Sequence, residues 1–338
     1  MSSDNRVTLK DIAAASGMSV TAVSQVLNGR PCRISKESRE RIERVAHDLN
    51  YVPNQVARSL VTHRFNTLAL VIPDMDSPFF SRLAAALIRR CHADGYALFV
   101  GTEFEGKGFV LSDFVASHGV DGLLIVVPDE PRANETLADE LGRLRVPYVL
   151  VDRTPSTIPG DKVGFDHELG GYLATRHLVG MGHHRIACLS NLDGSETGSL
   201  RADGYRRALE KARLPFDPTL LINAGYSIAS GYSAGPAVVA ADVTAVFSAS
   251  DSTTLGLLKY LHEVGVRVPN DLSIASYDNS AADLLFEPRL TSVEQDTDLL
   301  ADQAFSLMQS RIDGGAGAPR RVSLTPHLVL GDSVRSLK

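Results

Sequence analysis

Short apolar runs alternate with helix-like stretches from Thr67 onward, and this alternation limits the fold more than any other feature of the chain. The predicted strands are TLALVIP, YALFVGT, DGLLIVVP, PYVLVDR, RIACLSN, AVFSASD and DLSIASYD, and the helices between them include FFSRLAAALIRRCHADG, GGYLATRHLVGMG and TLGLLKYLHEVG. Strands that are apolar along their whole length indicate parallel sheets covered by helices on both faces. About 270 residues follow this pattern. That is too many for one doubly wound sheet with such short connections, so we expect two lobes with a ligand cleft between them.

The N-terminal residues follow a different, purely helical pattern. Residues 7–28 have the sequence VTLKDIAAASGMSVTAVSQVLN. Thr8 and Asp11 fit a capping box at the start of one helix, and Ser19 is placed to cap a second helix. Gly17 stands between them, where a tight turn needs a residue that tolerates positive φ. This arrangement predicts a helix-turn-helix, and the alternative is an ordinary helical corner inside a core.

A third helix and a short fourth segment complete this region. Ser35 is placed to cap the stretch KESRERIERVAHDLNYV, whose apolar stripe faces inward, and we expect Pro53 to end it. The following segment, NQVARSLVTHR, is too short to be a stable helix alone in water. It would need DNA or the same segment of a second subunit as a partner.

Charge is distributed unevenly along the chain. The whole sequence has 34 basic and 40 acidic side chains, a net charge of −6. Residues 1–64 have ten basic and six acidic side chains, a net charge of +4, which leaves −10 on the remainder. A small basic head on an acidic body is typical of a protein that meets nucleic acid through its N-terminal part only.

Several function classes are disfavoured by the composition. The three cysteines are widely spaced and form no CxxC pair, so neither a disulfide framework nor a zinc site is indicated. The N-terminus shows no apolar signal region, and no stretch approaches the ~18 apolar residues of a membrane span. We therefore expect a cytoplasmic protein with no membrane association.

Residues 7–28 and the stretch RISKESRERIERVAHDLNYVPNQVARSL resemble the head and hinge of the LacI/GalR-type bacterial transcription regulators. The layout of the remainder is similar to the periplasmic-binding-protein-like (type I) effector domain of the same family. The resemblance implies a small all-α helix-turn-helix head joined to an α/β two-lobed domain. The expected boundaries are 1–53 for the head, 54–65 for a hinge helix and linker, and 66–338 for the effector-binding and dimerisation domain, with an N-lobe of about 66–165 plus 296–324 and a C-lobe of about 166–295 plus 325–338.

The resemblance also implies which residues contact DNA. In that family the second helix enters the major groove, which would point Val20, Thr21 and Gln25 toward base edges. The hinge helices of two subunits pair in the minor groove, where Leu60 would wedge into a base step and bend the duplex. The complete candidate set is Thr8, Ser19, Val20, Thr21, Ser24, Gln25, Asn28, Tyr51, Asn54, Ala57 and Leu60.

Gln25 departs from the family pattern, in which arginine is usual at this position. Arginine pairs with the O6 and N7 atoms of guanine, whereas glutamine prefers the N6 and N7 atoms of adenine. We expect A·T in place of G·C at that base pair of the operator half-site. The alternative is that Gln25 contacts a phosphate and carries no base preference.

Polar clusters at the ends of the predicted strands supply the candidate effector site. By resemblance, the residues that line it are Asp76, Ser77, Phe79, Phe80, Asp166, Arg201, Tyr226, Ser250, Asp251, Asp278 and Gln295. Carboxylates that accept hydroxyl hydrogen bonds, a forked arginine and aromatic faces suit a sugar. Ser250 stands where relatives usually have asparagine, so the sugar of any one relative cannot be transferred to this chain.

Three motifs suggest an enzyme or a metal site but lack the required setting. The string Gly231-Tyr232-Ser233-Ala234-Gly235 matches G-x-S-x-G, yet it begins a helix and does not follow a strand. His183 and His184 are adjacent, so their side chains diverge and do not converge on a metal. The stretch GGAGAP has no strand before it and no helix after it, as a phosphate loop would need. We expect no catalysis, no metal and no cofactor.

The combined features predict a DNA-binding transcriptional repressor whose operator affinity is switched by a small effector, a sugar. A homodimer follows from the head, because one helix-turn-helix spans few base pairs and two of them read a palindromic operator. Two alternatives stay open. One is a corepressor-type regulator that senses a nucleobase or an anion, and the other is a transport-type sugar-binding protein.

Overall fold

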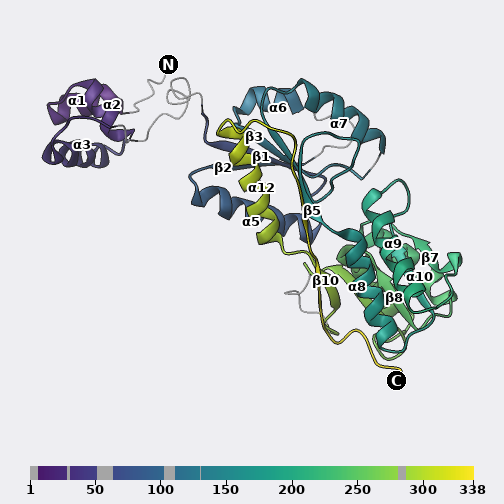
Figure 1. Ribbon diagram of the computed structural model, residues 1–338. Helices are drawn as coiled ribbons and strands as arrows, with labels where there is room; N and C mark the ends of the chain where they lie inside the picture. The colour runs from purple at the N-terminus through teal and green to yellow at the C-terminus, as the bar shows by residue number, and fades with distance from the viewer. Residues whose placement is uncertain (1–6, 29–30, 52–63, 103–110, 130, 281–286) are drawn as a thin grey trace, which may run out of the picture. The chain divides into compact units, whose positions relative to one another are not determined.

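The computed structural model describes residues 7–28, 31–51, 64–102, 111–129, 131–280 and 287–338. The chain divides into two compact units, Met1–Phe65 and Asn66–Lys338. Among the described residues, the regular structure of the first unit is helical, and the second unit contains two mostly parallel sheets (Figure 1). This is the fold class predicted from the sequence.

The described residues of the N-terminal unit form three helices, α1 (Leu9–Ser16), α2 (Val20–Leu27) and α3 (Lys36–Asp48). The backbone N–H and the hydroxyl of Thr8 both donate to the Asp11 carboxylate, at 2.8 and 2.7 Å, and Ser19 accepts from the Ala22 N–H at 3.1 Å. Gly17 follows α1 with a φ of 68°. The predicted caps and the turn of the helix-turn-helix are therefore confirmed.

The core of this unit is small and depends on all three helices. Its fully or nearly fully buried side chains are Ile12, Ala13, Val23, Val26, Ile42 and Ala46. The helix α3 ends at Asp48, earlier than the prediction that Pro53 ends it. The backbone turns at Asn50, which has a φ of 51°, and the N–H of Tyr51 bonds back to the Ala46 carbonyl at 2.9 Å. This turn lets Tyr51 pack against the core instead of extending the helix.

The first lobe of the second unit is a six-stranded sheet. In spatial order its strands are β11 (Arg321–Leu324), β5 (Asp161–Phe165), β4 (Tyr148–Val151), β3 (Gly122–Ile125), β1 (Thr67–Ile72) and β2 (Ala97–Thr102), all paired in parallel. The helices α5 (Pro78–Ala93) and α12 (Thr297–Ile312) cover one face, and α6 (Leu111–His118) and α7 (Pro131–Arg143) cover the other (Figure 1).

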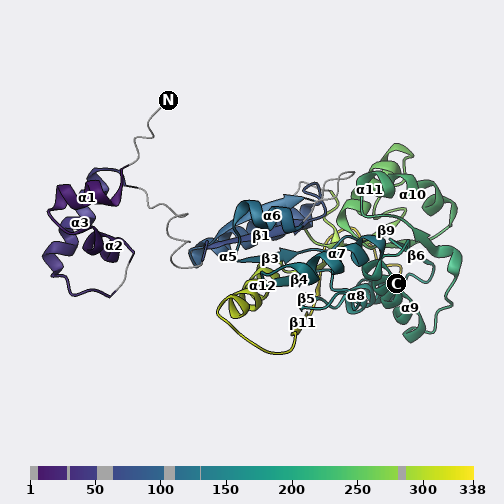
Figure 2. The same cartoon turned by 90° about the horizontal axis from the view of Figure 1, so that it is seen from above.

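The second lobe repeats this design. Its sheet order is β12 (His327–Val329), β10 (Thr291–Glu294), β9 (Ser273–Asp278), β8 (Ala245–Ser248), β6 (Ile186–Ser190) and β7 (Leu221–Asn223), of which only the β10–β12 pair is antiparallel. The helices α8 (His167–Gly180) and α9 (Glu196–Lys211) lie on one face, and α10 (Ile228–Ala240) and α11 (Asp251–Glu263) on the other (Figure 2). A 3₁₀ turn, Pro218–Leu220, precedes β7.

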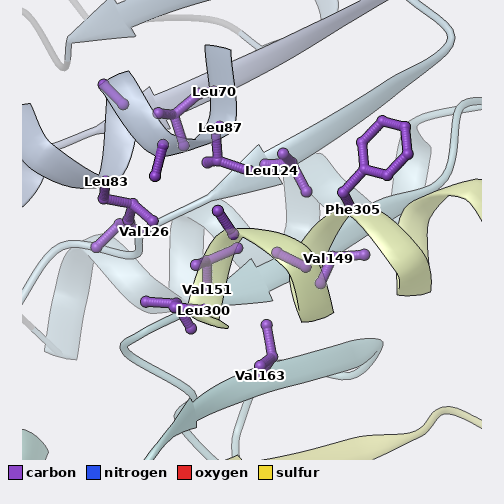
Figure 3. Close-up of a cluster of buried hydrophobic side chains, with 14 of the residues drawn as sticks. Leu70, Leu83, Leu87, Leu124, Val126, Val149, Val151, Val163, Leu300 and Phe305 are labelled. Atoms are coloured by element: carbon purple, nitrogen blue, oxygen red, sulfur yellow. The ribbon is translucent and has the colours of Figure 1, made fainter. Parts of the chain in front are cut away.

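Helix α12 joins the core of the first lobe from far along the sequence. Figure 3 shows its Leu300 and Phe305 among the strand residues Val149, Val151 and Val163. Phe305 is 1% exposed and meets the ring of Tyr96 edge-on at 5.8 Å. Each lobe is thus completed by residues that follow the other lobe in the sequence.

The chain crosses between the two lobes three times among the described residues. The crossings connect β5 to α8, β10 to α12, and β11 to β12. Parallel strands bring their carboxyl ends to one edge of a sheet, and the first two crossings leave from such edges. These edges therefore face the region where we expected a ligand cleft.

Five strands were not among the predicted apolar runs, namely β5, β7, β10, β11 and β12. In β5 the sequence DKVGF carries Asp161 and Lys162, yet both are buried. The Asp161 carboxylate accepts from Nε and Nη2 of Arg311 at 2.7 and 2.8 Å, which compensates its burial.

No helix among the described residues is long and apolar enough to cross a membrane.

Candidate functional site

The outward face of α2 is the candidate DNA-contacting surface of the N-terminal unit. Val23 and Val26 are the buried residues of α2 and belong to the core. Val20 is 42% exposed, and Thr21 beside it is also exposed. Ser24 and Gln25 lie one turn further along the same face and are half-buried. The apolar side chain of Val20 is of the kind that contacts a thymine methyl group in the major groove.

The other candidate residues of this unit support the helix and its ends. Asn28 donates from Nδ2 to the Ser24 carbonyl at 2.7 Å and so closes the C-terminal end of α2. Thr8 and Ser19 are exposed caps whose polar atoms lie at helix N-termini, where phosphate oxygens bind readily. Burial raises the pKa of Tyr51. The predicted hinge residues Asn54, Ala57 and Leu60 lie outside the described residues.

A cavity lies between the two lobes of the second unit, at the carboxyl ends of several strands. Its empty space is about 440 Å³, including the open mouth. The residues that line it are Asp74, Ser77, Phe79, Phe80, Asp152, Arg153, Thr197, Arg201, Tyr226, Ser250, Ser252 and Asp278. The first lobe contributes the ends of β1 and β4 and the start of α5, and the second lobe contributes the remainder.

Arg201 is the central cation of this cavity. Its side chain is 5% exposed, and its guanidinium lies 3.8 Å from the ring centre of Tyr277. It donates from Nη1 to the Ala249 carbonyl and from Nη2 to Gln295 Oε1 at 3.3 Å. Nε of Arg201 is buried without a hydrogen-bond acceptor among the described residues. A buried charged group with a spare donor is costly unless a ligand or water accepts from it.

The fold places Arg201 by packing α8 closely against α9. A Cβ atom on Gly171 would lie 2.1 Å from the Arg201 carbonyl oxygen, so only glycine permits this approach of the two helices. Ser195 caps α9 by accepting from the Gly198 N–H at 2.8 Å. The cap fixes the first turn, and Thr197 and Arg201 then face the cavity from successive turns of the same helix.

Asp278 faces Arg201 from the end of β9. Its Oδ1 lies 3.8 Å from Nη2 of Arg201, and its Oδ2 accepts from the Asp251 N–H at 3.2 Å. Burial raises the pKa of this carboxyl to about 7, although Arg201 acts in the opposite direction. Near neutral pH the carboxyl is therefore divided between a form that only accepts hydrogen bonds and a form that also donates one.

Buried polar side chains from both lobes lie next to Arg201. Asp152, at the end of β4, has a φ of 64° and accepts at Oδ1 from Nε2 of Gln295 at 3.2 Å. Burial raises the pKa of Asp152. Burial, followed by the nearby Arg201, lowers the pKa of His167 well below its ordinary value, so this imidazole is neutral. Because Asp152 belongs to the first lobe and Gln295 follows β10 of the second, their hydrogen bond links the lobes.

The structure gathers Ser77, Phe79, Phe80, Arg201, Tyr226, Ser250 and Asp278 of the predicted effector set around one cavity. Ser250 also caps α11 by accepting from the Thr253 N–H at 3.1 Å. Ser250 therefore both lines the cavity and caps the helix, a capping role that an asparagine could also fill.

The remaining predicted residues do not form part of the cavity wall. Asp76 is exposed, whereas Asp74, two positions earlier, lines the cavity and accepts from the Ser77 N–H at 2.7 Å. Asp166 is exposed and caps α8 by accepting from the Leu169 N–H at 2.9 Å. Asp251 is 1% exposed because its two carboxylate oxygens hold the Ser276 hydroxyl and the Ser280 N–H, both at 2.7 Å.

Asp74, Asp152, Arg153, Thr197 and Ser252 line the cavity but were not among the predicted residues. Asp152 and Arg153 directly follow the apolar run PYVLV, so the strand-end argument applied to the other clusters would have found them. Thr197 lies one turn before Arg201 on the same helix, which is the spacing of helical neighbours.

The motifs that resembled enzyme or metal sites have structural explanations. Ser233 lies within α10, as predicted from its sequence setting. His183 is buried in the connection between α8 and β6, where its two ring nitrogens lie 2.9 Å from the Thr244 hydroxyl and 3.1 Å from the Arg335 carbonyl. Among the described residues no group of three or more His, Cys, Asp or Glu side chains could hold a metal ion.

Comparison with known proteins shows relatives that span nearly the whole chain. Residues 8–54 match the bacterial regulatory proteins of the lacI family, and residues 175–334 match a periplasmic binding protein-like domain. An HTH-type transcriptional repressor PurR from Vibrio atlanticus (strain LGP32) is 31% identical over 336 residues, which are 98% of this chain and 99% of that protein.

Two solved structures show the same architecture over nearly the full length. A transcriptional regulator CelR–cellobiose complex has 32% sequence identity and a TM-score of 0.71, covering 97% of this chain and 100% of CelR. A lac repressor dimer bound to operator and the anti-inducer ONPF has 26% identity and a TM-score of 0.83, covering 98% of this chain and 100% of that one.

Proposed function

Since this chain belongs to the lacI family of bacterial regulatory proteins, we propose that it is a repressor whose affinity for a palindromic operator is set by a sugar bound between its lobes. The proteins it resembles are transcription regulators and not enzymes. One observation carries the proposal. A single chain contains both a helix-turn-helix with an exposed recognition face and a polar cavity at the strand ends of a two-lobed unit.

The chemistry of the cavity supports a hydroxylated ligand. The carboxylates of Asp74, Asp152 and Asp278 and the hydroxyls of Ser77 and Ser250 offer acceptors for ligand hydroxyl groups. Nε of Arg201 offers a donor that finds no acceptor in the part of the chain that the structure describes. This combination of many acceptors, a forked donor and aromatic walls fits a sugar ring with polar edges and an apolar face.

A flat heterocycle such as a nucleobase is the second candidate effector. Phe80 and Tyr226 come from opposite lobes, and the guanidinium of Arg153 lies 5.4 and 5.8 Å from their ring centres. Stacked rings and a guanidinium also bind planar ligands.

We propose that effector binding acts on DNA through the angle between the lobes. A ligand held by both lobes favours one relative position of the two lobes. The hinge segment of each subunit would then move together with the first lobe of that subunit. Ordering or melting of these segments would then change operator affinity, and Leu60 would wedge into the central base step only when they are ordered. The ligand must bind the two states with different affinity for this to occur.

The test combines a binding screen with a DNA-binding assay on the full-length protein. Thermal-shift measurements with sugars, nucleobases and sugar phosphates identify which class raises the melting temperature. A gel shift with the operator, with and without that compound, then measures the change in DNA affinity. We expect a sugar to raise the melting temperature and to change operator affinity at least fivefold. A compound that binds without changing operator affinity would contradict the proposal, and a nucleobase in place of a sugar would select the second candidate.

A further inference from the structure

A second and larger cavity adjoins the first. Its empty space is about 1270 Å³, including the open mouth. Arg153 and Thr197 line both cavities, so the two share a boundary. The remaining lining residues are Val127, Pro128, Asp129, Glu135, Ala138, Asp139, Thr154, Pro155, Thr157, Phe165, His167, Gly194, Glu196, Leu200 and Arg321.

Arg153 forms the partition between the two cavities. Its Nη1 donates to the Val127 carbonyl at 3.2 Å, which ties it to the first lobe. The same guanidinium faces the ring of Phe80 from its own lobe and the ring of Tyr226 from the other. The side chain is long and half-buried, so Arg153 is the group that a ligand spanning both cavities would displace.

A hydrogen bond between the lobes adjoins the second cavity. Nδ2 of Asn191, just after β6, donates to Oδ2 of Asp129, which follows β3 in the other lobe, at 3.2 Å. Asp129 itself lines the second cavity. A ligand that reaches this cavity would therefore touch a side chain that takes part in lobe closure.

The lining of the second cavity has a definite charge preference. Among the described lining residues, the four carboxylates of Asp129, Glu135, Asp139 and Glu196 outnumber the guanidinium groups of Arg153 and Arg321. The imidazole of His167 is neutral. Such a lining accepts hydrogen bonds from neutral hydroxyl or cationic amino groups and disfavours phosphate and carboxylate.

We propose that the second cavity is a subsite for an extension of the effector, which is therefore a molecule of two linked rings and not a single ring. This inference rests on the proposed function, because it assumes that the first cavity holds the effector. One ring lies beside Arg201, the linkage passes Arg153 and Thr197, and a neutral second ring bears hydroxyl or amino groups toward the carboxylates. Contact with Asp129 makes the second ring a contributor to lobe closure.

The test compares one-ring and two-ring probes on the full-length protein by isothermal titration calorimetry. The pairs are glucose with cellobiose, glucose with maltose, galactose with lactose, and adenine with adenosine. Thr157→Trp fills the second cavity from an exposed loop position, and Ser156→Trp, at the neighbouring exposed residue outside both linings, is the matched control. Glucose 6-phosphate tests the charge preference, because it extends the ring with an anion.

We expect the two-ring member of at least one pair to bind at least tenfold more tightly than its one-ring partner. Thr157→Trp should remove this gain and leave the one-ring affinity within twofold, while Ser156→Trp should change neither. If in every pair the one-ring probe binds as tightly as its two-ring partner, the subsite proposal is overturned and the proposed function still stands. A gain in affinity that survives Thr157→Trp would have the same consequence. Glucose 6-phosphate binding tenfold more tightly than glucose would also overturn it. If no probe of either size binds, the effector proposal fails and the subsite fails with it.

Discussion

The pH dependence of effector binding is the most specific consequence of the cavity. Asp278 has a pKa of about 7, raised by burial and opposed by Arg201. Its ionised form only accepts hydrogen bonds and so can hold two ligand hydroxyls, whereas the protonated form places a donor toward them. The affinity for a hydroxylated effector should therefore increase as the pH rises through 7 and reach a plateau above it.

The magnitude follows from the fraction of the carboxyl that is ionised. At pH 6, one unit below the pKa, roughly one-tenth is ionised, and at pH 8 roughly nine-tenths is ionised. Because the apparent affinity scales with the population of the competent form, we expect an increase of about tenfold, or about 1.4 kcal/mol, between these two conditions. Asp278→Asn cannot titrate, so its affinity should be lower and nearly independent of pH.

The assay is calorimetric titration of the full-length protein with the tightest-binding probe from the screen, at half-unit steps from pH 5.5 to 8.5. Asp271→Asn is the matched control, because Asp271 lies on the same lobe in a surface pair with Arg267, whose hydrogen bonds lower its pKa far below this range. An affinity that stays flat or falls with increasing pH would refute the reasoning. So would a slope that persists in Asp278→Asn.

Two further predictions concern the first lobe and the DNA-binding head. Arg311→Met leaves the Asp161 carboxylate, whose side chain is 1% exposed, without its partner. The free energy of unfolding, measured by urea denaturation, should therefore fall by about 3–5 kcal/mol. An unchanged denaturation midpoint would contradict the pairing. The loss of stability should be smaller when Asp161→Asn is combined with Arg311→Met. In the parent protein the stabilisation by this pair should be lost as the pH falls below 3.8, the ordinary pKa of an aspartate, because Arg311 holds the pKa of Asp161 lower in the fold. Gln25→Arg should move the preference at one base pair of each half-site from A·T to G·C by about 1–3 kcal/mol, measured by fluorescence anisotropy on a panel of half-sites. An unchanged preference would mean that Gln25 contacts only the DNA backbone.

The sequence pattern was a good guide where local residues decide the structure. The apolar runs that begin at Thr67 and at Ile186 are strands because every residue in them is apolar or small, and the three helix caps formed as their residues indicate. Strand β5 was missed because its stability comes from a distant residue. Asp161 is acceptable in a buried strand only with Arg311, which lies 150 residues later.

The site shows the same division between local and distant causes. Asp251 and Asp278 both follow apolar runs and were both expected to face the ligand. Only Asp278 reaches the cavity, because Asp251 is used to hold the loop that contains Ser280. Asp152 was overlooked although it follows a strand directly. Its left-handed backbone and its bond to Gln295 depend on how the two lobes meet, which no local pattern contains.

The central claim is that one molecule couples the interlobe cavity to DNA binding. The most direct measurement is a closed thermodynamic cycle on the full-length protein, with operator affinity measured with and without the effector and effector affinity measured with and without operator. The account predicts that both ratios differ from one by at least fivefold and equal each other, as linkage requires. It also predicts that Arg201→Met brings both ratios to one while leaving operator affinity in the absence of effector within about threefold. Tight effector binding with unchanged operator affinity would contradict the account.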